Sequence, residues 1–136
     1  MNGIKKYWLA VSLACTSCMV YAQNPQTATL NWSCSESVEL RSNTPATLSF
    51  EIRTGSEEIT VTTGSSTKTF SVTSVTGEWT DVNAAGSLAY DLLFGERTGS
   101  ATLKRENGVW EFTLDFSSHP QGVHQKFVLS GFQQIP

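Results

Sequence analysis

Hydrophobic and polar residues alternate along most of this chain with a period of two. Apolar side chains occupy every second position in the segments 48–52, 59–61, 70–72, 88–94 and 110–116. Successive residues of a strand point to opposite faces of a sheet, so this alternation indicates strands with one buried and one wetter face. No segment repeats apolar residues at helical spacing over several turns. The pattern therefore predicts an all-β chain.

Short runs rich in Thr, Ser, Val and aromatic residues are separated by the Gly, Asn, Asp and Pro residues that favour turns. The predicted strands are 27–34, 37–42, 46–53, 58–63, 67–75, 78–82, 86–94, 99–106, 109–116 and 124–131, with a helical turn at 83–86. Short connections make sequential neighbours antiparallel, which gives a meander of about 8–10 strands. A sheet with one apolar face must pack against a second sheet or close on itself. Both a β-sandwich and a small closed barrel fit, and the breaks at Pro45 and Gly77 slightly favour the sandwich.

The dipeptide Asn107-Gly108 predicts a two-residue hairpin turn, because both residues accept the positive φ angles of a type I′ turn. Pairing Glu106 with Val109 then separates apolar partners from polar partners along the whole hairpin. The expected pairs are Arg105–Trp110, Leu103–Phe112, Ala101–Leu114 and Gly99–Phe116 on one face, and Lys104–Glu111, Thr102–Thr113 and Ser100–Asp115 on the other. We expect Arg105 to stack on Trp110.

A second hairpin is expected around the four-residue turn 54–57. Its predicted pairs are Arg53–Glu58, Ile52–Ile59, Phe50–Val61 and Glu51–Thr60. The apolar pairs again share one face, so the hydrophobic pattern favours this register.

The first 22 residues have the features of an export signal. Lys5 and Lys6 form a positive start, 7–20 is apolar, and Val20-Tyr21-Ala22 fits a peptidase site. The apolar run is shorter than the roughly 20 residues that a membrane span needs. We therefore expect cleavage after Ala22, a single all-β domain over 23–136, no transmembrane span, and a periplasmic or secreted location.

A lipid-anchored form attached through Cys18 is the alternative to plain cleavage. The pattern disfavours it, because Ser12 and Cys15 stand where a lipoprotein peptidase expects an aliphatic residue before Cys15 and Cys18. Beyond the signal only Cys34 remains, so no internal disulfide can form. Cys34 alternates in phase with Trp32, which predicts a buried free thiol, with an intermolecular disulfide as the alternative.

The charge of the chain argues against nucleic-acid binding. Nine basic and twelve acidic residues give a net charge of −3, and removing Lys5 and Lys6 with the signal leaves seven basic residues and a charge of −5. The remaining Lys and Arg residues are dispersed rather than clustered, whereas phosphate binding needs a basic patch.

Candidate chemistry is sparse. His119 and His124 are the two histidines and fall in a loop, where a carboxylate such as Asp115 could join them. Metal sites need three or four ligands, and a catalytic histidine needs a nucleophile and an orienting acid, none of which is identifiable. No phosphate-binding, nucleophile-elbow or zinc-protease motif occurs. We therefore expect no catalytic residues, no metal and no cofactor.

Trp79 is the aromatic residue without an apolar stripe, since turn-forming and polar residues, among them Asp81, surround it. Such a Trp either closes one end of the core or, if exposed, anchors a sugar ring or a protein partner. The sequence favours an exported, non-catalytic β domain that binds a protein or glycan of the cell envelope, with Trp79, Asp81, His119 and His124 as candidate binding residues. The alternatives are an enzyme without a known motif and a barrel that carries a small apolar ligand, lined by the stripes 88–94 and 110–116.

Overall fold

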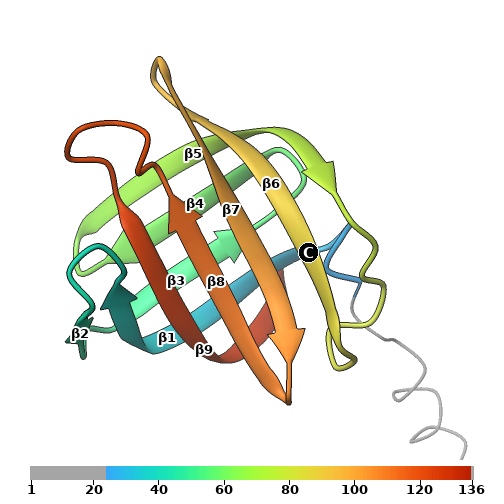
Figure 1. Cartoon of the computed structure of the whole chain (residues 1–136). Coiled ribbons are helices and arrows are strands. Elements are labelled where there is room, and N and C mark those ends of the chain that lie inside the picture. The colour runs from blue at the N-terminus through green and yellow to red at the C-terminus, as the bar shows by residue number, and fades with distance from the viewer. Residues whose placement is uncertain (1–23, 136) are drawn as a thin grey trace, which may run out of the picture.

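The computed structural model describes residues 24–135, which form a closed antiparallel β-barrel of eight strands with one short additional strand (Figure 1). The predicted export signal Met1–Ala22, with Cys15 and Cys18, lies outside the described residues. The strands are β1 (Thr29–Glu39), β2 (Thr44–Ala46), β3 (Phe50–Thr54), β4 (Glu58–Thr63), β5 (Ser66–Thr76), β6 (Gly86–Phe94), β7 (Arg97–Glu106), β8 (Val109–Asp115) and β9 (His124–Ile135).

The sheet closes because β1 pairs with β3 on one side and with β9 on the other. Every consecutive pair from β3 to β9 is hydrogen-bonded in order, so the chain is a meander throughout. The all-β meander is confirmed, whereas the slight preference for a sandwich is wrong. The hairpins never cross to a second sheet, and closure removes the free edges that a sandwich would leave.

Three register shifts help the long strands to curve around the barrel. The pairing of β1 with β9 shifts register on both sides of Cys34, and the pairing of β5 with β6 shifts between Val72 and Ser74. The β1 bulge explains why the predicted strands 27–34 and 37–42 are one strand. Ser35 and Glu36 are both exposed, and the alternation resumes with a buried Ser37.

Two other predicted elements differ from the structure. The expected strand 46–53 is divided into β2 and β3 by residues 47–49, and β2 pairs with β1 outside the barrel. The expected strand 78–82 belongs to the β5–β6 connection, where the backbone N–H of Ala84 donates to Asp81 O in a turn. This segment packs over the end of the barrel instead of adding a strand.

The Asn107-Gly108 hairpin has the predicted register from Glu106–Val109 to Ser100–Asp115, with positive φ at both turn residues. Gly99 and Phe116 lie beyond its last pair. The Arg105 guanidinium lies 5.0 Å from the centroid of the Trp110 ring, as expected for a stacked pair. The Lys104 ammonium pairs with Glu106 at 3.2 Å rather than across the strands with Glu111.

The register predicted for the second hairpin is wrong by two residues. Ile52 lies opposite Val61 and Arg53 opposite Thr60, where the pattern placed them opposite Ile59 and Glu58. A shift of two keeps every side chain on its own face, so hydrophobic alternation alone does not separate the two registers. The turn chemistry decides: the Gly55 N–H donates to Glu58 O and closes a tighter connection.

The barrel interior is filled by the inward residues of all eight strands. Trp32, Phe112, Phe127 and Leu103 are among its largest fully buried side chains. Cys34 is buried and unpaired, as predicted, and its thiol donates to Glu36 O. Burial raises the pKa of this thiol, which keeps it protonated and unreactive.

One buried polar pair stands out in this core. The indole N–H of Trp32 donates to Thr54 Oγ1 over 3.0 Å, and both residues are fully buried. Thr54→Val would keep the shape of the side chain and leave the indole donor without a partner. We expect the free energy of unfolding to fall by about 1–3 kcal/mol in urea denaturation. Thr102→Val on the exposed face of β7 is the control and should change it by less than about 0.5 kcal/mol.

Candidate ligand-binding pocket

The two ends of the barrel are built differently. The meander places the turns 55–57 and 107–108 and the β5–β6 connection 77–85 at one end, here called the closed end. The turns 64–65 and 95–96 and the β8–β9 loop 116–123 lie at the other, here called the open end (Figure 1).

The β5–β6 connection closes the first end. Val82 is fully buried, and its carbonyl accepts the indole N–H of Trp110 over 2.8 Å. Below it, the rings of Trp32, Trp110 and Phe132 contact one another with centroids 5.3–5.8 Å apart. An aromatic cluster under a hydrogen-bonded loop leaves this end filled.

Trp79 is part of this closure, as one of the two interpretations of the sequence expected, and the exposed anchor that would make it a binding residue is wrong. Its side chain is 2% exposed, its indole N–H donates to Ala84 O over 3.0 Å, and its ring lies against Gly86. Asp81 is half-buried and accepts the backbone N–H of Asn83 at 3.0 Å, so it stabilises the same turn. Both predicted binding residues therefore have structural contacts in the closing loop.

His119 and His124 lie at the opposite end, so the structure does not bring the four candidate residues together. His119 Nε2 is 3.0 Å from Thr98 O, whereas His124 Nε2 is 3.8 Å from Asp115 Oδ2. Within residues 24–135 no three His, Cys, Asp or Glu side chains converge as a metal site would require.

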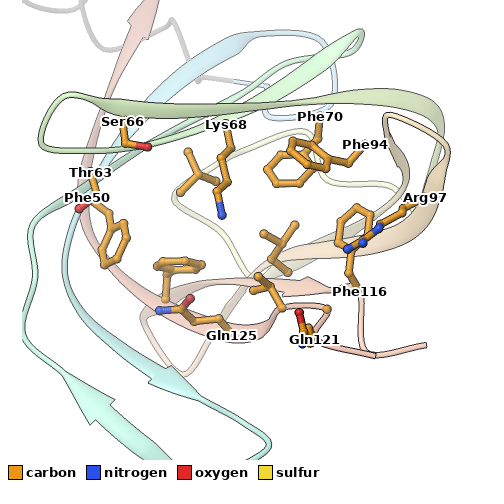
Figure 2. A pocket seen from close by; sticks show the side chains of 15 residues that line it. Phe50, Thr63, Ser66, Lys68, Phe70, Phe94, Arg97, Phe116, Gln121 and Gln125 are labelled. Carbon is orange, nitrogen blue, oxygen red and sulfur yellow. The ribbon is translucent and has the colours of Figure 1, made fainter. Parts of the chain in front are cut away.

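The open end holds a pocket of about 220 Å³ that enters the barrel between β3–β5 and β6–β9 (Figure 2). Its walls are mostly apolar. Five phenylalanines contribute: Phe50, Phe70, Phe94, Phe116 and Phe127. Three aliphatic side chains join them: Val61, Leu114 and Val123.

The phenylalanines form two groups on either side of the pocket. Phe70 contacts Phe94 and Phe116 at centroid distances of 5.0 and 5.4 Å, and Phe50 meets Phe127 edge-on at 5.0 Å. Phe70, Phe116 and Phe127 are buried, but Phe94 is 40% exposed at the rim. An exposed large aromatic beside a concave apolar surface is typical of a binding site.

Lys68 and Arg97 supply the charge of this pocket. In Figure 2 the amine of Lys68 projects from β5 into the cavity, and Arg97 stands at the right of the view near Phe94 and Phe116. Of the described residues, no Asp or Glu lines the pocket.

Several hydrogen bonds fix the position of the β8–β9 loop at the rim of the pocket. Arg41, from the β1–β2 turn, donates to the carbonyls of Ser117 and His119, each over 3.1 Å. Hydrogen bonds from the Ser117 hydroxyl and backbone N–H hold the pKa of Asp115 below its usual value, against a smaller opposing effect of burial, and His124 and Arg41 lower it further.

Ser117→Ala removes the strongest of these contacts, so we expect the pKa of Asp115 to rise towards its ordinary value. A carboxyl group whose pKa is lower in the folded state than in the unfolded state stabilises the fold at pH values above its unfolded pKa. This stabilisation is lost as the pH falls through the folded-state pKa. The variant should therefore lose less stability on acidification than the native chain. Carbon NMR titration of the Asp115 carboxyl measures the shift, with Ser118→Ala as the control; an unchanged pKa would contradict this assignment.

Lys68 and Arg97 were missed as candidates from the sequence, yet the sequence contains a signal for them. Lys68 alternates in phase with Phe70, and Arg97 alternates in phase with Ala101 and Leu103. A cation at an inward position of a strand is an exception to the pattern that predicts the barrel. Of the stripes proposed for a carrier, Phe94, Leu114 and Phe116 do line the pocket.

Comparison of the chain with family models, with curated proteins and with solved structures finds no match. Within residues 24–135 no helix has the length and apolar composition of a membrane span. The function is therefore argued from the pocket alone.

Proposed function

We propose that this protein is an exported, non-catalytic binding protein whose barrel takes a small apolar ligand into the pocket at its open end. The observation that supports this proposal most strongly is that one end of the barrel is filled, whereas the other end is open and has aromatic walls. Ligand pockets are concave, mostly apolar and carry a few polar groups that orient the ligand, and small β-barrels of eight strands hold single small ligands in this way.

The proposal replaces the protein- or glycan-binding role that the sequence favoured. The candidate anchor for that role was an exposed Trp79, and Trp79 is buried in the closing loop. His119 and His124 lie near the rim, where His119 and Arg41 hold the β8–β9 loop in place. In the proposed function these residues shape the entrance and do not contact a partner themselves.

Titration with the neutral fluorophore N-phenyl-1-naphthylamine tests the proposal. Transfer of this probe into an apolar pocket raises its emission, so we expect a saturable increase with one site per chain. Mass spectrometry of organic extracts from the natively purified protein should also show a co-purifying small molecule. A linear, non-saturating emission together with repeatedly empty extracts would contradict a ligand-binding role.

Export is the second part of the proposal and depends on Met1–Ala22. We expect the protein recovered outside the cytoplasm to begin at Gln23 when its N-terminus is sequenced. Recovery of the chain in the cytoplasm with Met1 in place would contradict export, and a lipid-modified Cys18 would replace plain cleavage by the anchored alternative.

A further inference from the structure

The charge of the pocket is opposite to the charge of the chain. The sequence has twelve acidic and nine basic residues, yet both charged residues that line the pocket are cations. A cavity with low-dielectric walls and charge of one sign attracts ligands of the opposite charge.

Lys68 is placed at the inner face by the pleat of β5, directly across from Val61 of β4. Its ammonium points into the cavity beside apolar side chains (Figure 2). It forms no ion pair with any carboxylate of residues 24–135. Lys68 is exposed, as is Arg97, so its stem lies along the apolar lining while its unpaired ammonium stays accessible to an incoming anion.

Arg97 begins β7 and lies across the β6–β7 turn from Phe94. It too has no carboxylate partner in the described part of the chain. Its planar guanidinium offers paired donors that match the two oxygens of a carboxylate. Arg97 and Lys68 thus reach the same cavity from different strands.

Four neutral polar side chains also line the pocket, Thr63, Ser66, Gln121 and Gln125, and two of them are free of side-chain partners in the described residues and flank the cations. The Ser66 hydroxyl lies one inward position before Lys68, and Gln121 reaches the cavity from the β8–β9 loop (Figure 2). Both can donate hydrogen bonds to an oxygen atom. The phenylalanine walls accept only an apolar group, so the pocket has separate polar and apolar parts.

The size of the pocket limits the ligand. Its volume of about 220 Å³ is below the 300–1,000 Å³ range typical of sites for drug-sized molecules. A single alkyl chain, or a few linked rings of similar volume, fits this space, and a lipid with two long chains does not.

We infer that the ligand is a small monocarboxylate with a single apolar tail, an inference that rests on the proposed function. Lys68 and Arg97 bind its carboxylate at the open end, and the tail lies between the two groups of phenylalanines.

Displacement of N-phenyl-1-naphthylamine by decanoate and by decanol at pH 8 tests this inference. The two molecules share a tail and differ in the head group. We expect decanoate to bind the native chain about tenfold more tightly than decanol, since a hydrogen-bonded charge pair in an apolar site contributes about this factor. The double variant Lys68→Gln/Arg97→Gln should lose about tenfold in decanoate affinity and keep its affinity for decanol.

The matched control is Arg53→Gln/Lys126→Gln, which removes the same charge from outward positions of β3 and β9. It should change decanoate affinity by less than about twofold, because neither charge lines the pocket and charges at a distance are screened. Three results would overturn the carboxylate inference without contradicting an apolar binding pocket. They are equal binding of decanoate and decanol to the native chain, binding of neither while the probe still binds, and an equal loss of decanoate affinity in the control variant. Failure of the probe itself to bind, together with empty extracts, would overturn the proposed function instead. Retained decanol binding shows that the double variant is folded.

Discussion

Gly86→Ala is expected to lower the free energy of unfolding by about 3 kcal/mol, at the upper end of the cost of overpacking a well-filled interior. A Cβ atom at this position would lie 2.1 Å from Cδ1 and 2.5 Å from Cγ of the Trp79 ring. Trp79 cannot move aside cheaply, because its ring is buried and its indole N–H is bonded to Ala84 O. The added methyl group therefore forces the closing loop off the barrel.

Gly131→Ala is the matched control, since Gly131 also lies in a strand and a Cβ there would meet no atom within 4 Å. Alanine is the better strand residue of the two, so the control should be neutral or slightly stabilising. Urea denaturation followed by circular dichroism measures both variants. Equal stability of the two variants would show that Trp79 does not seal the closed end.

Val61→Trp is expected to weaken binding of N-phenyl-1-naphthylamine by at least about tenfold. Val61 lines the pocket and is the cross-strand neighbour of Lys68. An indole at this position would occupy much of the roughly 220 Å³ available. Because the pocket is open to solvent, the larger side chain should cost little stability compared with overpacking of a closed core.

Thr62→Trp places the same side chain one residue further along β4, on the outer face of the barrel. Thr62 is adjacent to Thr67 there, and their hydroxyl groups are hydrogen-bonded at 3.0 Å. Fluorescence titration should give the native dissociation constant for this control. If both variants bind equally well, the ligand does not enter the pocket that Val61 lines.

The period-two alternation was sufficient to predict most of the strands and the all-β meander, because inward and outward positions differ strongly in this chain. It also predicted the buried Cys34 and the hairpin at Asn107-Gly108. Barrel closure was not predictable, because a sandwich core and a barrel interior need the same alternating residues. The bulge after Cys34, which joins two predicted strands into β1, has no signature in a pattern of period two.

The site was less accessible to sequence reasoning for two physical reasons. Trp79 has polar neighbours along the chain, and its burial comes from a loop folding back over the barrel end, where it meets Gly86. The pocket joins side chains from seven strands and one loop, which no local window brings together. The sequence does place Lys68 and Arg97 at inward positions of their strands, which indicates that the interior is not uniformly apolar.

Amide and indole NMR spectra recorded during titration with decanoate test the central claim most directly, namely that ligands enter at the open end while the other end stays sealed. The largest shift changes should fall on Lys68, Phe94 and Phe116 at the open end, and the indole N–H signals of Trp79 and Trp110 should stay in place. Shift changes centred on those two indoles, or spread evenly over the outer face, would contradict it.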